Sequence, residues 1–565
     1  MTSRSHAGLG RERRVVRGAR AVAIAFAALA FLAGCVAIPS SSGVNEGPEV
    51  KNGGGGPGPV DLPQGPPKGA SKTEIFADFL QAATSSVGSY QIAREFLTAK
   101  ASQGWDPTKS VLIREKPSNP QDLGDNQFSY TVSTNASVNA LGVYSQQATN
   151  SDETLDYSFS KVNGQWRISS LPDGIVLSRE SFTNTFAAYP IYFYDPAFRY
   201  LVPDVRWFPS GTTVPNRIVA ALIAGPSDWL QNGVVTTAFP AGVAVGSPVV
   251  VHGSSAVVDF SADAASAKAQ ERAQMQNQLQ WSLQGDQLSS ASMTAHGAPI
   301  AVDASLATQG PVSSANSAPL ILKGKQFGFY PRLDSFGALS TQIVGLGPSA
   351  IELNGAQTIA AALTSAGVYR VTGSGQPRLV DSRPNLIAPT IDPSGYIWTV
   401  PANDASAIVA TGSDGVPHAI TSTVPSGSAI VAMHVSHDGT RLLMYLTTSA
   451  GPELVVAGIV RRSGVPASLG ELLDLPVSSG QPLDATWVDP STVAALTSSG
   501  GESTVSSYVI GGTVGDSTTT EGAVHLAGAV NIDSLRLITG SGEVQQLRAS
   551  GWQDILVASV LATQQ

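Results

Sequence analysis

The stretch that decides the fold is Asp438-Gly439-Thr440-Arg441-Leu442-Leu443-Met444-Tyr445-Leu446, a turn followed directly by an apolar strand. Asn354-Gly355 and Ser394-Gly395 also precede apolar strands, and the three glycines lie 40 and 44 residues apart. This interval is close to the length of one four-stranded propeller blade. The repeat therefore predicts an all-β, propeller-like domain over residues 318–565.

The strands that follow these turns are short, rich in aliphatic residues and bounded by turn residues. They are Ile359–Leu363, Ile397–Val400, Leu442–Leu446 and, after Asp489-Pro490, Val493–Leu496. At the observed spacing the domain has room for about five or six blades. A β-sandwich with chance spacing is the alternative interpretation.

Before this repeat, residues 188–306 have the pattern of an α+β unit. Strands are predicted around Ile191 and Leu201, followed by a helix with Thr213 near its start and Pro215 in its first turn. Gly225-Pro226 ends that helix. A later helix has apolar residues at helical spacing, which is typical of a core face: Met275, Leu279 and Leu283.

Residues 71–180 have a second α+β pattern. Ser71 and Glu74 form a capping box at the start of a helix, and another helix is predicted around Ile92–Leu97. Alternating strands follow, and Asn163-Gly164 indicates a tight hairpin turn. Two helices followed by a curled antiparallel sheet predict a cone of the NTF2-like kind. The predicted fold class is therefore two α+β domains followed by an all-β propeller-like domain.

The N-terminal 34 residues have the layout of an export signal. Five arginines at positions 11–20 precede an apolar run that ends in Leu32-Ala33-Gly34-Cys35, a lipoprotein cleavage box containing the only cysteine of the chain. We predict that residues 1–34 are removed and that the Cys35 thiol carries a diacylglyceryl group, with palmitate as a further acyl chain. An ordinary secretory signal is the alternative. Residues 35–70, rich in Gly and Pro, are predicted to be a disordered tether.

Charge argues against nucleic acid as a partner. The 565-residue chain carries a formal charge of −9, with 33 Lys and Arg against 42 Asp and Glu. The first 34 residues contribute +5, so the remaining chain carries −14. An acidic protein is not attracted to phosphate backbones or anionic membranes, so membrane attachment depends on the lipid. One lipidated cysteine leaves no thiol for a disulfide, metal or redox site.

Catalytic and metal-binding patterns give weak signals. No nucleophile elbow, phosphate-binding loop or zinc-protease motif occurs in the sequence. Ser158 and Lys161 have the spacing of a Ser/Lys pair, but on a strand such residues point to opposite faces. His434 and His437 have the same geometry, so we predict no shared metal. We therefore predict a protein without enzyme activity, catalytic residues or cofactor.

Other candidate residues have structural explanations. The carboxylates of the blade turns are expected to accept hydrogen bonds from their own backbone, although a glycosidase pair on the propeller is the alternative: Asp392, Asp438 and Asp489. Four aromatic residues could anchor an interface, but are more typical of the core: Trp105, Trp207, Phe208 and Trp229. Pro172-Asp173-Gly174 and Asp195-Pro196 are predicted turns that could orient the first two domains.

Several segments, in this order, resemble the LpqB family of actinobacterial lipoproteins. They are the cleavage box at 32–35, Arg94–Thr98, Trp166–Ile168, Leu171–Gly174, Tyr192–Pro196, Leu201–Asp204, Leu222–Pro226 and Val258–Phe260. The resemblance implies that residues 188–306 form a GerMN-like domain before the propeller. It also implies a role beside the MtrA–MtrB two-component system, where the lipoprotein acts on the extracytoplasmic part of the sensor histidine kinase and influences cell-wall homeostasis and division.

Three hypotheses about function follow. The first is a lipid-anchored protein on the outer face of the cytoplasmic membrane that modulates such a kinase. The second is a module that binds cell-wall glycan or peptide, with peptidoglycan as the partner. The third is an envelope hydrolase, which needs paired acidic or nucleophilic residues in one cleft.

Overall fold

The computed structural model describes residues 63–306, 310–312, 317–333, 336–477, 479–528, 531–549 and 551–565, all of them in the unit formed by residues 59–565. The predicted signal, Cys35 and most of the predicted tether lie outside the described residues. The end of that tether, residues 63–70, is described, and the Gly69 N–H donates to Gln165 Oε1 at 2.6 Å.

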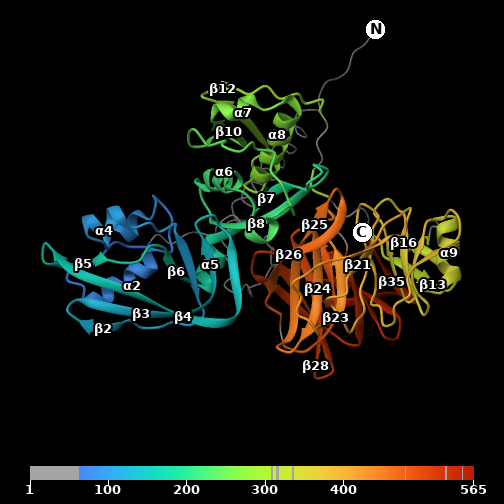
Figure 1. The fold of residues 1–565 in the computed structure, drawn as a ribbon. Coiled ribbons are helices and arrows are strands. Elements are labelled where there is room, and N and C mark those ends of the chain that lie inside the picture. Colours follow the sequence, from blue (N-terminus) through green and yellow to red (C-terminus); the bar gives the residue numbers. More distant parts are fainter. Residues whose placement is uncertain are drawn as a thin grey trace, which may run out of the picture. The chain divides into compact units, whose positions relative to one another are not determined.

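The first domain places three helices before a six-stranded sheet (Figure 1). The helices are α2 (Lys72–Ala82), α3 (Gln91–Glu95) and α4 (Ala99–Gly104). The strands are β1 (Ser110–Arg114), β2 (Gln121–Gly124), β3 (Gln127–Asn139), β4 (Tyr144–Val162), β5 (Gln165–Ser170) and β6 (Ile175–Ser178). They run in the order β5-β4-β3-β1-β6, with β2 also paired to β3. Helix α5 (Arg179–Thr185) follows β6.

The capping box predicted at Ser71 is confirmed. Glu74 N–H donates to Ser71 Oγ, and Ser71 N–H donates back to Glu74 Oε2. This start orients α2 so that Phe76 lies on the sheet, with its ring centroid 5.2 Å from Tyr130 and 4.9 Å from Tyr157. Edge-to-face aromatic pairs of this kind favour close packing of a helix on a sheet.

The second helix of this domain was predicted too long. Helix α3 stops at Glu95, and Leu97 instead forms a β-bridge with Ile168 of β5. Thr98 N–H donates to the Ile168 carbonyl at 2.9 Å, and the Thr98 side chain then caps α4, a helix that the sequence pattern did not indicate. Pairing with a strand distant in sequence therefore overrides the local helical pattern. The order of helices before a sheet is as predicted, whereas the NTF2-like assignment stays a prediction.

The second domain begins with a two-stranded ribbon, β7 (Phe186–Tyr194) and β8 (Leu201–Pro209), followed by α6 (Val214–Ala224) and the short helix η1 (Asp228–Leu230). Its four-stranded sheet runs β12-β11-β10-β9. The remaining elements are β9 (Val250–His252), β10 (Ser255–Phe260), α7 (Ala262–Ser266), α8 (Ala269–Gln284), β11 (Ser290–Ala295) and β12 (Ala298–Pro299).

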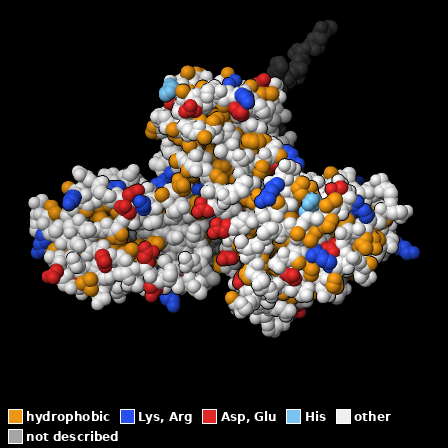
Figure 2. Space-filling view, in the orientation of Figure 1, with side chains coloured by type: hydrophobic (Ala, Val, Ile, Leu, Met, Phe, Trp, Pro, Cys, Tyr) orange, Lys and Arg blue, Asp and Glu red, His pale blue; other side chains and the backbone are white. Residues whose placement is uncertain are grey.

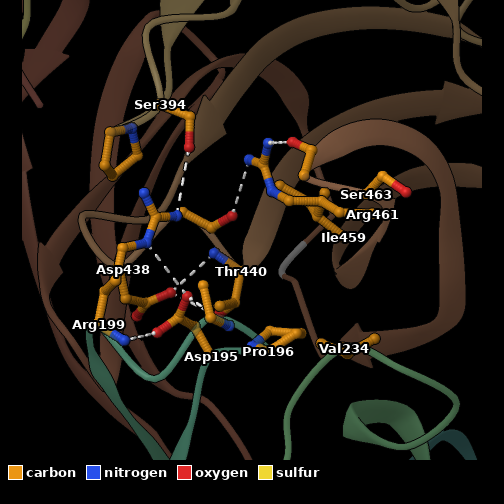
Figure 3. Close-up of a pocket in the computed structure, with 14 residues that line it drawn as sticks. Asp195, Pro196, Arg199, Val234, Ser394, Asp438, Thr440, Ile459, Arg461 and Ser463 are labelled. Carbon is orange, nitrogen blue, oxygen red and sulfur yellow. Dashed lines mark hydrogen bonds and ion pairs between the residues drawn. The ribbon is translucent and has the colours of Figure 1, made fainter.

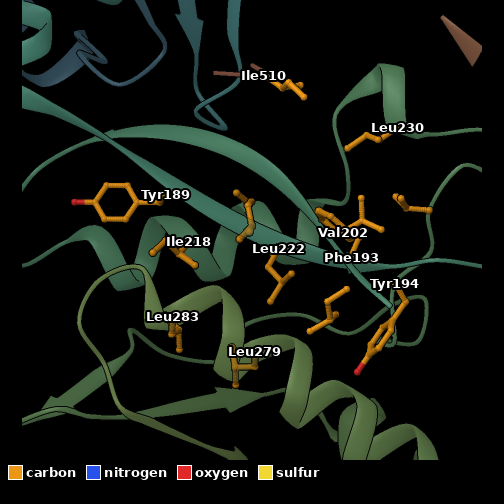
Figure 4. Packing of buried hydrophobic residues seen from close by; sticks show 14 of the residues in the cluster. Tyr189, Phe193, Tyr194, Val202, Ile218, Leu222, Leu230, Leu279, Leu283 and Ile510 are labelled. Atoms are coloured by element: carbon orange, nitrogen blue, oxygen red, sulfur yellow. The ribbon is translucent and has the colours of Figure 1, made fainter. Parts of the chain in front are cut away.

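The core of this domain confirms the predicted helix faces (Figure 4). Ile218 and Leu222 of α6 are buried together with Leu279 and Leu283 of α8. Gly225 directly follows α6, as predicted. The same hydrophobic cluster continues into Ile510 and other residues of the C-terminal domain. The second domain is therefore packed against the third through a shared apolar core.

The C-terminal domain is a β-propeller built from antiparallel sheets (Figure 1). The meanders are β15–β18, β19–β22, β23–β26, β27–β30 and β31–β34. Helix α9 (Ala338–Leu346) precedes the first of them. The first three meanders contain β15 (Ala350–Leu353), β16 (Ala360–Thr364), β17 (Gly367–Val371), β18 (Arg378–Asp381), β19 (Thr390–Ile391), β20 (Ile397–Thr399), β21 (Val409–Thr411), β22 (Pro417–Ala419), β23 (Ala429–Val435), β24 (Arg441–Thr448), β25 (Gly451–Arg462) and β26 (Val465–Leu475).

The remaining two meanders contain β27 (Gln481–Asp489), β28 (Thr492–Ser499), β29 (Glu502–Val509), β30 (Val514–Thr520), β31 (Ala523–Ala527), β32 (Arg536–Thr539), β33 (Glu543–Arg548) and β34 (Gly551–Val557). Helix η2 (Ile532–Ser534) lies between β31 and β32.

A sixth group of strands closes the propeller. The last strand, β35 (Val560–Gln564), pairs antiparallel with β13 (Leu320–Lys323) and parallel with β15, and β14 (Gln326–Phe329) lies outside β13. The first strands of successive groups contact one another in a ring: β15 to β19, β23, β27, β31, β35 and back to β15. Among the described residues this ring has six members and closes on itself, which is the arrangement of a propeller, so the β-sandwich alternative is wrong.

The predicted turn signals occupy equivalent places in four blades, between the first and second strands. The Asn354 side chain accepts hydrogen bonds from Thr358 and Ile359 N–H, and Asp489 accepts one from Ser491 N–H at 2.7 Å. These side chains replace backbone acceptors within the turn, which is why Asn and Asp recur there.

The surface of the described residues mixes apolar, basic and acidic side chains on the face shown in Figure 2. That face has no continuous field of Lys and Arg of the kind that binds nucleic acid. In the part of the chain that the structure describes, none of the helices has the length and apolar character needed to cross a membrane.

Candidate functional site

A polar hollow of about 250 Å³ lies where the loop after β7 meets three turns of the propeller (Figure 3). We call it the Asp195 hollow. Asp195 and Arg199 come from the second domain, and Ser394, Asp438 and Arg461 come from the propeller. This volume lies below the roughly 300–1,000 Å³ of most small-molecule sites.

The Asp195 carboxylate organises its own loop. Oδ1 accepts hydrogen bonds from Arg199 N–H at 2.5 Å and from Tyr200 N–H at 2.7 Å, and Oδ2 accepts one from Ala197 N–H at 3.2 Å. These bonds hold Arg199 so that its Nη2 donates to Ser394 Oγ at 3.3 Å. The predicted Asp195-Pro196 turn therefore positions a contact between the second domain and the propeller.

Arg461 forms the opposite wall of the hollow. Its Nη2 lies 2.6 Å from Asp392 Oδ2 and also donates to the Gly439 carbonyl at 3.1 Å. Asp392 is fully buried and also accepts hydrogen bonds from Tyr396 N–H and Trp398 Nε1. Arg461 therefore neutralises a buried carboxylate and links two blades.

A second buried ion pair borders the hollow through Asp438. The Asp438 carboxylate contacts the Arg441 guanidinium and also accepts hydrogen bonds from Ser436 and Thr440. Burial alone would raise the pKa of Asp438, but Arg441 together with these hydrogen bonds outweighs burial and holds the pKa below its ordinary value. Arg441 is itself fully buried, and its guanidinium lies 4.9 Å from the ring centroid of Trp487.

The carboxylates around the hollow are therefore committed to structural partners. The hydrogen bonds predicted for Asp392, Asp438 and Asp489 within their own turns are confirmed. Because its charged side chains are paired and its volume is small, the Asp195 hollow has the character of a polar contact between two domains. Among the described residues, none of the groups of three or more His, Cys, Asp or Glu is placed to hold a metal ion.

The joint extends beyond the hollow through close apolar packing. A Cβ at Gly458 of β25 would clash with the Val234 side chain, so this glycine allows the segment after η1 to approach the propeller. Trp207 of β8 donates from Nε1 to the Gly511 carbonyl at 3.0 Å. Trp229 of η1 is also buried, beside β26. We call this set of contacts the domain joint.

A buried ion pair connects the first and second domains. Arg206 Nη2 lies 2.7 Å from Asp204 Oδ2, and Arg206 Nη1 donates to the Leu141 carbonyl of the first domain at 3.1 Å. Asp204 also accepts hydrogen bonds from the Ser227 N–H and hydroxyl, at 2.8 and 2.7 Å. Arg206 Nη2 also donates to the Gly225 carbonyl at 3.1 Å, so the segments 201–204 and 222–226, both singled out in the sequence, meet at this ion pair.

Other sequence segments are explained by similar internal contacts. Arg94 donates to the carbonyls of Ser102 and Trp105, and Asp173 accepts a hydrogen bond from Asp106 N–H at 2.8 Å. Asp259 Oδ1 accepts hydrogen bonds from the Thr294 hydroxyl and Gly297 N–H, at 2.7 and 2.8 Å.

The remaining sequence candidates fall in separate places. Cys35 and the box Leu32, Ala33 and Gly34 lie outside the described residues. Lys161 lies over the Trp166 ring, at 5.0 Å from its centroid, and Ser158 belongs to the C-terminal part of the same strand, β4. The four aromatic candidates are all buried, as expected for core residues: Trp105, Trp207, Phe208 and Trp229.

The two histidines of the third blade have different surroundings. His434 Nδ1 lies 3.4 Å from Glu352 Oε2. Burial lowers the pKa of His434, but the hydrogen bond and charge of Glu352 outweigh this and raise the pKa above its ordinary value. Burial lowers the pKa of His437, and this effect outweighs the opposing charges of Asp438 and Glu352.

Sequence reasoning missed Arg206, Arg441 and the pair His525 and Asp484. His525 Nδ1 lies 2.6 Å from Asp484 Oδ2, although the two residues are 41 positions apart in sequence. Arg206 lies within a strand that is buried throughout. A charged residue inside an apolar strand is a usable signal, because it requires a buried partner.

Comparison with known proteins assigns all three domains. Residues 65–183 match the model described as "Lipoprotein LpqB, N-terminal domain", and residues 336–560 match "Lipoprotein LpqB beta-propeller domain". Residues 190–300 match "Sporulation and spore germination", which agrees with the GerMN-like domain expected from the sequence.

Curated relatives support the same assignment. Lipoprotein LpqB of Cutibacterium acnes is 32% identical over 276 residues, which cover 46% of this chain and 44% of that protein. Lipoprotein LpqB of Thermobifida fusca is 29% identical over 282 residues, with the same coverage of both chains. The matches therefore span less than half the length of these relatives.

Solved structures are more distant. The first GerMN domain of the sporulation protein GerM from Bacillus subtilis is 20% identical, with a TM-score of 0.17, and the match covers 22% of this chain and 94% of that one. Kuenenia stuttgartiensis hydrazine synthase is 14% identical, with a TM-score of 0.28, over 37% of this chain and 66% of that one. From its N-terminal and propeller domains and its named relatives, the chain belongs to the LpqB family of lipoproteins.

Proposed function

We propose that this protein is anchored to the outer face of the cytoplasmic membrane through lipid on Cys35, and that it modulates a two-component sensor kinase of the MtrA–MtrB type without catalysing a reaction. Its role would be in cell-wall homeostasis and cell division. Membership of a lipoprotein family supports the anchor. The kinase is the partner that the family resemblance implies.

The observation that carries the regulatory role is how the three described domains are fastened together. The Arg206 ion pair contacts Leu141 of the first domain, and the domain joint connects the second domain to the propeller. Buried contacts of this kind favour a single interaction surface assembled from several domains. A preorganised surface loses less conformational entropy when it binds a partner.

The lipid supplies the second physical element. Two or more acyl chains anchor a protein stably, since each buried CH₂ contributes about 0.8 kcal/mol. Confinement to the membrane raises the effective concentration near a membrane-embedded kinase, so contacts that are weak in solution suffice. The predicted tether of about 35 residues has an average reach of roughly 30–35 Å, at 5–6 Å times the square root of its length.

Cys35→Ala tests the anchor. We expect the variant to keep the thermal unfolding curve of the wild type, to leave the membrane fraction and to lose most of its effect on kinase output. Tethering commonly raises apparent affinity about 10²–10⁴-fold, and this gain would be lost. Cell fractionation and a reporter of the response regulator measure the two effects. Ser40→Ala, also in the tether, is the matched control.

A secreted form without lipid tests whether membrane tethering is needed at all. If an equal amount of this form restored kinase output as well as the wild type does, the tethering argument would be wrong.

Binding of cell-wall glycan or peptide is the second candidate function. The observation that favours it is the presence of hollows on a domain without an assigned catalytic site. Sedimentation with purified peptidoglycan separates the two proposals. Strong, saturable binding that does not require the kinase would favour the wall-binding function, whereas its absence would favour the regulatory one.

A further inference from the structure

A second hollow, of about 340 Å³, lies in the propeller domain. It forms where the starts of β15, β31 and β35 meet the turn between β32 and β33, and we call it the His525 pocket. His525, Val524, Ile538, Gly540 and Leu561 line it. Its volume is within the roughly 300–1,000 Å³ range of small-ligand pockets.

The imidazole of His525 is held in one orientation. Its Nδ1 lies 2.6 Å from Asp484 Oδ2, and the carboxylate is nearly buried. Asp484 is fixed in turn by hydrogen bonds from Ala485 N–H at 2.9 Å and from Leu526 N–H at 2.7 Å. In the neutral imidazole, a proton on Nδ1 leaves Nε2 as a hydrogen-bond acceptor. Among the described residues, this Nε2 has no hydrogen-bond partner.

The other polar side chains of the pocket are already engaged. Ser559 Oγ donates to the Leu322 carbonyl at 2.7 Å, and Ser349 Oγ donates to the Leu363 carbonyl at 3.4 Å. Thr539 Oγ1 lies 2.7 Å from Ser541 Oγ. The described lining contains no Lys, Arg, Asp or Glu. His525 Nε2 is thus an oriented acceptor that faces a lining with the aliphatic residues Val524, Ile538 and Leu561.

We propose that the His525 pocket binds a short, uncharged peptide segment that carries an aliphatic side chain. A backbone N–H of the peptide would donate to His525 Nε2, and the aliphatic group would pack on Val524, Ile538 and Leu561. Val524 is 52% exposed, so this contact would remove apolar surface from water.

A sugar fits the pocket less well than a peptide. Its several hydroxyl groups would need hydrogen-bond donors as well as acceptors, whereas the hydroxyl hydrogens of Ser349 and Ser559 are already donated to backbone carbonyls. The described lining also has no Trp, Tyr or Phe ring on which a sugar face could stack. This site is separate from the Asp195 hollow and stands whether or not the protein acts on a kinase.

Gly540→Val tests the site by filling it. A Cβ at Gly540 would have Val524 Cγ1 as its nearest contact, at an ordinary 3.8 Å, so the substitution occupies space in the pocket without displacing backbone. Gly345→Val in α9 is the matched control, because a Cβ there meets no atom within 4 Å. His525→Leu tests the hydrogen bond separately, because leucine has no acceptor.

The probe is N-acetyl-valyl-alanine amide, which is uncharged at both ends. Saturation-transfer NMR with the full chain in detergent, against a blank of detergent alone, measures binding at the valine methyl groups. We expect saturable transfer with the wild type and with Gly345→Val. Gly540→Val and His525→Leu should each weaken binding at least about tenfold, the effect of losing about 1.4 kcal/mol.

Two results would overturn the proposal. One is a lack of saturable transfer to the peptide, or equal transfer with wild type and Gly540→Val. The other is preferential, Gly540→Val-sensitive binding of N-acetylglucosamine, which would assign the pocket to a glycan.

Discussion

Arg441→Met is expected to destabilise the propeller by about 3–5 kcal/mol, the usual cost of removing one partner from a buried ion pair. The substitution removes the cation that contacts Asp438 and leaves that carboxylate buried. It also removes the hydrogen bond from Arg441 Nη1 to the Pro490 carbonyl at 2.7 Å, which connects the third blade to the fourth. Methionine keeps much of the side-chain volume, so the loss reports mainly on charge and hydrogen bonding.

Urea denaturation followed by tryptophan fluorescence measures this effect, because Trp487 lies against the Arg441 guanidinium. Arg462→Met is the control, since Arg462 is exposed at the end of β25 and surface substitutions usually change stability by less than about 0.5 kcal/mol. Equal unfolding midpoints for the two variants would contradict the assigned role of the ion pair.

Asp204→Ala is expected to have an effect of similar size on the second domain, also about 3–5 kcal/mol. Arg206 would remain fully buried without its carboxylate partner, and the Ser227 N–H and hydroxyl would lose their acceptor. Since Arg206 also holds the Leu141 carbonyl, we expect the contact between the first and second domains to loosen together with β8.

Hydrogen–deuterium exchange of the full chain distinguishes this result from general unfolding. Compared with the wild type, exchange should be faster around residues 139–143 and 201–209 and at Ser227. The exchange rates of the slowly exchanging propeller segments should stay unchanged. Asp228→Ala is the neighbouring control, because Asp228 is exposed and bonds to exposed Gln231. Unchanged exchange near Leu141 in Asp204→Ala would refute the proposed connection.

The sequence predicted the parts of the fold that depend on neighbouring residues. The Ser71 capping box and the end of α6 at Gly225 involve groups within a few positions of one another, and both are confirmed. The blade turns were found for the same reason, since Asn and Asp serve as local acceptors. Helix α3 was predicted too long because Leu97 pairs with Ile168, 71 residues later in the chain.

Long-range pairing also explains why the sequence left the blade number open. The closing group combines β13 and β14 with β35, so its strands come from both ends of the domain. A local repeat of 40 to 44 residues does not contain that information. The His525 and Asp484 pair is similar, because two ordinary residues become a site only when β27 and β31 lie side by side.

Photocrosslinking in intact cells tests the central claim most directly. A photoreactive residue placed at an exposed apolar position of each domain, Leu123, Val251 or Val416, would capture neighbours of the lipidated protein. We predict that at least one position captures the extracytoplasmic part of a sensor histidine kinase, and that the capture is lost in Cys35→Ala. Capture of cell-wall fragments alone, at every position, would contradict the regulatory account and favour a wall-binding protein.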